Sequence, residues 1–225
     1  MSVLTSLIQI NTVGSIENLS EQDVFDLLTH ADDQYYNAED PIMADAAYDL
    51  LYKQSKSTYP ANEYFTGIGS TVRGGKIKLP FTMGSLDQIY LGEYDKWITH
   101  HPVSSEQLVV SHKLDGCSAM IVYGGRGELQ IAYSRGDGQE GADITRHLIQ
   151  MPSVPTNCGG AVIVRGEVII SKDIFTKEIQ SRLMTRSGRP YKNARNCVAG
   201  LLNASSNPLW VYQHLTFVAY EIVQS

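Results

Sequence analysis

A lysine and an aspartate stand two residues apart in the segment Lys113-Leu-Asp115-Gly116. Side chains alternate between the faces of a strand, so in a strand Lys113 and Asp115 would share one face. Gly116 would then let a flat ligand lie against the backbone. A lysine amine can act as the nucleophile of covalent catalysis. Taken alone, however, such a segment is more often a surface hairpin with solvated charges.

A turn brings further charge to the same place. The residues Gly-Gly-Arg-Gly-Glu at 124–128 are typical of the loop of a hairpin. Pairing across this turn would place Arg135 opposite Gly116 and Gly138 opposite Lys113. Glycines in the Arg-Gly-Asp-Gly segment would keep the spot open for backbone contact with phosphate or sugar.

A third charged group belongs to another expected strand. Glu167 follows Arg165-Gly166 inside the otherwise apolar segment 161–170. A carboxylate in such a strand is costly to bury unless it is paired. Glu167 is therefore either an edge-strand residue that faces water or a carboxylate that meets a cation or a ribose hydroxyl.

The elements that must position these residues follow two short helices. Ser20 and the acidic residues after it indicate an N-cap, and apolar residues recur at helical spacing over 24–31. Residues 37–41 break this helix, and Asp45 caps a second one that ends near 59–60. Residues 61–80 read as a linker. A helix is expected at 172–186. Short segments, several of them bounded by glycine, predict strands at 108–110, 118–123, 128–134, 162–170 and 215–223.

Composition and charge exclude several classes of protein. The chain has 225 residues, of which 43% are apolar and 19% charged, so it can bury a core. It contains no apolar run long enough to span a membrane and no secretory signal. Three singly placed cysteines exclude a zinc knuckle or a disulfide framework and fit a reducing, cytoplasmic setting. The net charge of −6 means that any nucleic-acid groove is local or lies on another chain.

Four ordered motifs over some 110 residues resemble the adenylation domain of NAD-dependent DNA ligases: Lys113-Leu-Asp-Gly116, Ser134-Arg-Gly-Asp-Gly138 with Gly141-Ala-Asp143-Ile-Thr145, Arg165-Gly-Glu167-Val, and Asn193-Ala-Arg195-Asn196-Cys-Val-Ala-Gly200. Tyr35-Tyr36, Asp40-Pro41 and Asp45-Ala-Ala-Tyr48-Asp49 resemble the helical module of the NAD-dependent branch. Residues 79–87 resemble the start of the family's adenylation fold.

The resemblance implies an α+β fold in two parts. Residues 1–62 would form the helical module that holds the nicotinamide mononucleotide half of NAD. Residues 63–225 would form a nucleotidyltransferase domain of antiparallel sheets, ATP-grasp-like and without its last strands.

The resemblance also implies an enzyme and its chemistry. Lys113 would attack the α-phosphate of NAD, form lysyl-AMP and release nicotinamide mononucleotide, and AMP would pass to the 5′-phosphate of nicked double-stranded DNA. Mg²⁺ or Mn²⁺ would assist. The catalytic residues would be Lys113, Asp115, Arg135 and Glu167. Tyr220 would stack on adenine, and NAD would be bound by Tyr35, Tyr36, Asp45, Tyr48, Asp49, Ser85, Leu86, Gly116, Arg135, Glu167, Arg195 and Tyr220.

The sequence also departs from the family pattern. Ser111 stands where relatives have a glutamate that contacts adenine, and Asn203 where they commonly have an arginine that binds the nick phosphate. A second lysine strand and an OB-fold are absent from this sequence, so we expect a second ligase subunit, in a bacterial or phage-infected cytoplasm, to supply them. The alternatives are a fragment, a non-catalytic NAD- or adenylate-binding regulatory module, and an ATP- or GTP-using relative, against which the helical module argues.

Overall fold

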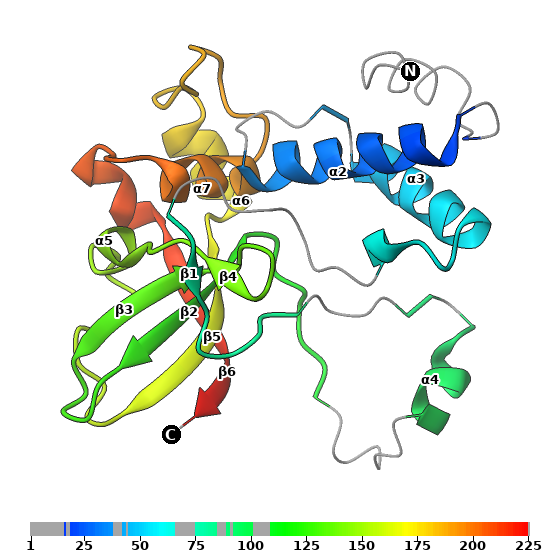
Figure 1. Cartoon of the computed structure of the whole chain (residues 1–225). Coiled ribbons are helices and arrows are strands. Elements are labelled where there is room, and N and C mark those ends of the chain that lie inside the picture. The colour runs from blue at the N-terminus through cyan, green and yellow to red at the C-terminus, as the bar shows by residue number, and fades with distance from the viewer. Residues whose placement is uncertain are drawn as a thin grey trace.

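The structure is a computed structural model that describes residues 16, 19–37, 42–43, 45–65, 75–84, 89–90, 92–100 and 109–224. Helices near the N-terminus lie to one side of the molecule. An antiparallel sheet and the helices that accompany it lie on the other (Figure 1). The predicted α+β class is confirmed.

The first region consists of α2 (Glu21–Asn37), α3 (Asp45–Thr58) and the 3-10 turn η1 (Glu63–Phe65). The predicted N-cap is confirmed, because the Ser20 hydroxyl accepts a hydrogen bond of 3.2 Å from the Asp23 amide. The two helices and η1 bury a cluster of their own, which includes Leu27, Leu28 and Leu51. The aromatic rings around Phe25 close one side of this cluster.

The sheet has the order β3-β2-β5-β6, and every neighbouring pair is antiparallel. It follows the predicted strands closely, with the bounds β2 Cys117–Tyr123, β3 Leu129–Ser134, β5 Val162–Ile169 and β6 Thr216–Gln224. One face carries the main core, in which Ala119 and Ile121 of β2 join α5 (Thr145–Leu148) and α7 (Ala194–Asn203). The turn η4 (Leu209–His214) leads into β6.

The other face of the sheet is partly covered by residues that the sequence assigned to a linker. Strand β1 (Ile77–Lys78) pairs with β4 (Glu140–Gly141), and Leu79 and Met83 pack against Met120 of β2. The linker prediction was therefore wrong over 75–80. Local hydrophobic alternation could not reveal a strand of two residues.

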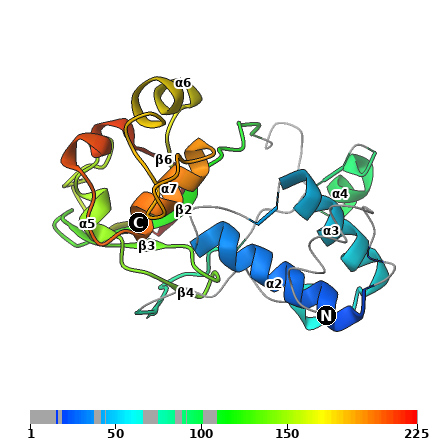
Figure 2. The same ribbon diagram turned by 90° about the horizontal axis from the view of Figure 1, so that it is seen from above.

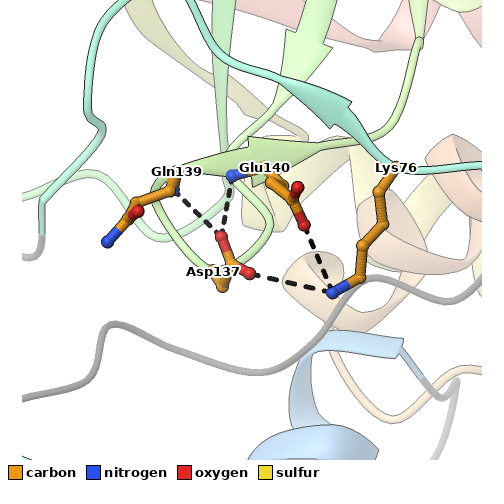
Figure 3. A network of polar contacts seen from close by, with 4 residues as sticks. All are labelled: Lys76, Asp137, Gln139 and Glu140. Carbon is orange, nitrogen blue, oxygen red and sulfur yellow. Dashed lines mark hydrogen bonds and ion pairs between the residues drawn. The ribbon is translucent and has the colours of Figure 1, made fainter.

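Polar contacts tie β1 to the chain that follows β3. Figure 3 shows Lys76 directed toward Asp137 and Glu140, at 4.0 and 3.4 Å. The same Asp137 carboxylate accepts hydrogen bonds from the backbone amides of Gln139 and Glu140, at 3.0 and 2.8 Å. These contacts fix the turn that carries the Arg-Gly-Asp-Gly segment.

Two further predictions of local structure were wrong. The helix expected over 172–186 consists of α6 (Lys172–Ile174) and the π-helical turn η3 (Phe175–Ile179) only. A turn at Thr185–Arg189 follows, in which Gly188 adopts a φ of 75° and its amide donates to the Thr185 carbonyl. Val109 and Val110 are not in a strand, and Leu108 lies outside the described residues. The sequence also gave no signal for α4 (Tyr94–His100), α5, α7 or η4.

The hairpin is displaced by two positions from the predicted register. Ala119 pairs with Ser134, so Arg135 follows the partner of Ala119 and lies level with Ser118 rather than Gly116. The loop between Gly124 and Glu128 accounts for one of these positions, and the bulge between Val122 and Tyr123 accounts for the other. A displacement by an even number keeps each side chain on its predicted face.

The helical region reaches the sheet region through α2. Helix α2 contacts α7. In both views the C-terminal end of α2 lies nearer the sheet, and α3 lies farther from it (Figures 1 and 2). Every helix in the described part of the chain is too short or too polar to cross a membrane.

Candidate functional site

The site begins at the segment that leads into β2. Lys113 and Asp115 precede this strand rather than belonging to it, and both side chains are exposed. Gly116 is buried, and a Cβ atom there would lie 2.1 Å from the carbonyl oxygen of Val168 in β5. The glycine is therefore required by the neighbouring strand, whereas the sequence analysis explained it by a ligand.

Glu167 occupies the centre of the site. It pairs with Ser118 of β2, and the Ser118 hydroxyl donates a hydrogen bond of 2.9 Å to its carboxylate. Burial raises the pKa of Glu167, and the bond from Ser118 opposes this shift. Glu167 is half-buried on the inner strand β5 and accepts this bond from Ser118, so it is not the edge-strand residue of the first alternative.

Three cations act electrostatically on this carboxylate. The charges of Arg195, Arg135 and Lys113 each lower the pKa of Glu167, so all three lie within electrostatic reach of it. They come from separate segments, namely the start of α7, the end of β3 and the approach to β2. The charges of the predicted lysine and of both predicted arginines therefore act on the predicted glutamate.

Arg195 connects α7 to the lysine segment. Its Nε atom donates a hydrogen bond of 2.9 Å to the carbonyl of Gly116 and lies 3.6 Å from the Asp115 carboxylate. The helix starts at a defined place because the Asn193 side chain caps it by accepting from the Asn196 amide at 2.8 Å. Local capping thus decides where the guanidinium meets the Lys113–Gly116 segment.

Arg135 links the two regions of the molecule. Arg135 follows β3. Its carbonyl accepts a hydrogen bond of 2.9 Å from the Gly138 amide, which closes a turn. Gly136 and Gly138 adopt φ values of 55° and 90° in this turn, as glycine permits. The charge of Arg135 lowers the pKa of Glu167 and also that of Asp32 in α2.

Tyr220 enters the site through a bulge. The register of β6 shifts between the pairs Arg165–Glu221 and Gly166–Ala219, which leaves Tyr220 as the extra residue. Bulges commonly redirect a side chain. Burial and the charge of Glu167 raise the pKa of Tyr220, while a hydrogen bond with Ser118 lowers it. Its ring therefore stands beside the carboxylate and is half exposed.

The helical region contains a polar cluster that the sequence did not indicate as a whole. The hydroxyls of Tyr48 and Tyr64 donate to the two Asp32 oxygens at 2.7 and 2.6 Å and lie 3.0 Å from each other. Burial raises the pKa of Asp32, and the two tyrosine bonds oppose the shift. Tyr48 is thereby held in one position, whereas Asp49 is exposed.

Some predicted residues cannot be placed. Ser85 and Leu86 lie outside the described residues, as do the side chains of Tyr35, Tyr36 and Asp45. The sequence analysis missed Ser118, Asp32 and Tyr64. Asp32 lies one helical turn before Tyr35, so the two share a helix face. Ser118 lies two residues after Gly116 of the lysine motif. Both positions could have been found from their spacing to predicted site residues. Tyr64 carried none.

The described residues contain no group of three or more histidine, cysteine or acidic side chains that could hold a metal ion. The acidic side chains at the site are Asp115 and Glu167. Mg²⁺ is usually bound by one or two carboxylates together with substrate phosphates. The site therefore fits an ion shared with a phosphate and does not fit a metal held by protein alone.

Comparison with known proteins shows the family of the chain. Residues 75–225 match the family model for the NAD-dependent DNA ligase adenylation domain. A DNA ligase of Acanthamoeba polyphaga mimivirus is 32% identical over 195 residues, which are 84% of this chain and 28% of that protein. DNA ligases of Campylobacter concisus and Helicobacter pylori are 31% and 30% identical over 84% and 92% of this chain. The chain spans about a third of the length of these relatives.

Proposed function

Because the chain belongs to the family of NAD-dependent DNA ligase adenylation domains, we propose that it transfers AMP from NAD to its own Lys113. AMP would then pass to the 5′-phosphate of nicked double-stranded DNA. The observation that carries this proposal is the contact of Arg195 with the lysine segment, at 2.9 Å from the Gly116 carbonyl and 3.6 Å from the Asp115 carboxylate. The three cations that act on Glu167 suit a substrate with two phosphates.

The first step is a substitution at phosphorus. The neutral amine of Lys113 attacks the α-phosphate, a P–N bond forms, and the bond from that phosphorus to the bridging oxygen breaks. Nicotinamide mononucleotide leaves with the bridging oxygen, and the amine proton passes to water, because Lys113 is exposed. Arg135 and Arg195 stabilise the negative charge that develops on the phosphate.

The remaining residues hold the two halves of the substrate. Tyr220 offers a half-exposed ring beside Glu167 for the adenine, and Glu167 accepts from the ribose hydroxyls. In the helical module, residues 1–62 of the predicted division, Tyr48 and the neighbouring acids receive the cationic nicotinamide mononucleotide half. A magnesium or manganese ion shared by Asp115 and the phosphates would supply charge neutralisation.

A second subunit is also part of the proposal. That partner is proposed to contribute further strands and an OB-fold to the sealing of DNA. The chain alone is proposed to carry out self-adenylation, and the cytoplasm of a bacterium or of an infected host is the proposed location.

The test is transfer of label from NAD to the chain. NAD labelled in its adenylate should give one acid-labile adduct on Lys113 in the wild type and none in Lys113→Arg. Lys96→Arg, on the exposed helix α4, is the matched control and should label normally. Measurable NAD affinity without any adduct would overturn the proposal in favour of a non-catalytic binding module. Label from ATP and none from NAD would overturn the choice of substrate.

A further inference from the structure

One carboxylate lies among the tyrosines of the helical region. The two oxygens of Asp32 accept hydrogen bonds from the hydroxyls of Tyr48 and Tyr64, at 2.7 and 2.6 Å. Asp32 belongs to α2, Tyr48 to α3 and Tyr64 to η1. The carboxylate therefore joins all three elements of this region and fixes the position of the Tyr48 hydroxyl.

Three groups stabilise the ionised form of the Asp32 carboxylate. Burial raises the pKa of Asp32, whereas the hydrogen bonds from Tyr64 and Tyr48 and the charge of Arg135 lower it. Burial also raises the pKa of Tyr64, so this hydroxyl keeps its proton and remains a donor. Water screens a half-buried charge less than a charge at the surface, so the carboxylate acts strongly on its neighbours.

The Tyr48 ring is held on a second side by another aromatic ring. It stacks on Tyr52, with 6.2 Å between the ring centroids and an angle of 28° between the planes. The same stack attracts a cation of the chain itself, because the Lys56 ammonium lies 5.7 Å from the centroid of the Tyr52 ring. With its hydroxyl bonded and its ring stacked, Tyr48 loses little freedom when a ligand binds.

The bond between Tyr48 and Asp32 suits a ligand whose charge depends on its redox state. A nicotinamide ring carries a positive charge when it is oxidised and none when it is reduced. A phenol that donates to a carboxylate is polarised, which makes its ring more negative. The face of such a ring attracts a cation more strongly than it attracts a neutral ring. This pair of residues can therefore distinguish the two redox states.

We propose that Asp32 is a specificity-determining residue, which through the Tyr48 hydroxyl makes the chain prefer an oxidised, positively charged nicotinamide ring to a reduced, neutral one. The inference rests on the proposed function, which places the nicotinamide mononucleotide half of NAD at Tyr48. Asp32 acts on this ligand through Tyr48 and is therefore a positioning residue. Tyr64 supports it by holding the second carboxylate oxygen.

The experiment measures binding of nicotinamide mononucleotide and of its reduced form to the full chain, by equilibrium dialysis at pH 8. Neither ligand carries AMP, so binding is observed without turnover. The wild type should bind the oxidised form about tenfold more tightly than the reduced form. Asp32→Asn keeps the size of the side chain and removes its charge. It should lose about fivefold in affinity for the oxidised form and less than about twofold for the reduced form.

Further variants test the route through the tyrosine. Asp26→Asn makes the same change at an exposed position of α2 and is the matched control, which should leave both affinities unchanged. Asp32→Glu keeps the charge and should retain part of the preference. In a Tyr48→Phe background, Asp32→Asn should reduce the preference no further, because the hydroxyl through which it acts is gone. The ratio of the two affinities does not depend on the fraction of folded chain, so a destabilised variant remains informative.

Three outcomes would overturn the inference. They are equal affinity of the wild type for the two forms, an equal loss of both affinities in Asp32→Asn, and a further loss of preference when Asp32→Asn is added to Tyr48→Phe. The second outcome would assign Asp32 to packing alone, and the third would exclude the route through the Tyr48 hydroxyl.

Labelling by NAD separates this inference from the proposed reaction. A wild type that labels Lys113 but binds the two forms equally would refute the inference and leave the reaction standing. A wild type that prefers the oxidised form but does not label would refute the reaction and leave the inference standing.

Discussion

The pKa of the Glu167 carboxylate is set by opposing influences. Burial raises it, and the Ser118 hydrogen bond and three nearby cations lower it. Ser118→Ala removes the hydrogen bond, so the pKa of Glu167 should rise further. If the ionised carboxylate takes part in adenylation, the acid limb of the rate–pH profile should move to higher pH. The measurement is the rate of labelling by NAD across pH.

Ser118→Thr is the control for this change, because it keeps the hydroxyl and threonine suits a strand. Its acid limb should stay near that of the wild type. If Ser118→Ala left the acid limb of the rate–pH profile in place or moved it to lower pH, Glu167 would not be the group whose titration produces that limb.

Asp32 makes a prediction about stability. Burial raises its pKa above the usual value for aspartate, so the folded chain holds this proton up to a higher pH than the unfolded chain. The stabilisation from Asp32 is complete below the unfolded pKa and is lost as pH rises through the folded pKa. As the pH rises through this range, the free energy of unfolding should fall more in the wild type than in Asp32→Asn. Urea denaturation at each pH measures it.

Asp26→Asn, at an exposed position on the same helix, provides the comparison. It should show the same pH dependence as the wild type over this window. If the free energy of unfolding of Asp32→Asn followed the same pH dependence as that of the wild type, the Tyr48 and Tyr64 hydroxyls would offset the effect of burial on the Asp32 pKa completely.

At the scale of the elements, the start of β2 is limited by its approach to β5. A Cβ at position 116 would meet the carbonyl oxygen of Val168, which is backbone and cannot rotate away. Gly116→Ala should therefore lower the free energy of unfolding by about 1–3 kcal/mol. Gly125→Ala is the matched control, because nothing lies within 4 Å of a Cβ there. Equal urea midpoints for the two variants would contradict this account.

The sheet could be predicted from the sequence to a large extent, because its signals are local. Alternating Val and Ile residues and a glycine-rich turn located β2, β3, β5 and β6 to within one or two residues. The hairpin argument brought Arg135 and the lysine segment together even though its register was displaced by two. The face of each side chain was preserved, and the site depends on the face.

What could not be predicted depends on distant contacts. Strand β1 exists because the turn after β3 pairs with it, and its two residues carry no pattern of their own. Tyr64 reaches Asp32 across a separation of 32 residues, which no local rule anticipates. The helix expected over 172–186 ends at Ile179, and Met184 instead forms an antiparallel bridge with Pro190.

At the scale of the whole molecule, the helical region and the sheet region bury separate clusters. The cluster around Leu27 and Leu51 shares no residue with the clusters of the sheet. A chain that begins at residue 75 should therefore keep a cooperative urea transition and its strand signal in circular dichroism, and it should lose labelling by NAD. Loss of cooperative folding would mean that the contact of α2 with α7 is essential to the sheet region.

The uneven distribution of charge gives the molecule an electric dipole. Helices α2 and α3 together contain seven acidic and two basic residues, whereas residues 172–195 contain two acidic and seven basic residues. In the field of a polyanion such a body experiences a torque before it makes any contact, and the torque turns its positive end forward. A polyanion that approached the molecule would thus meet α6 and α7 first and the N-terminal helices last.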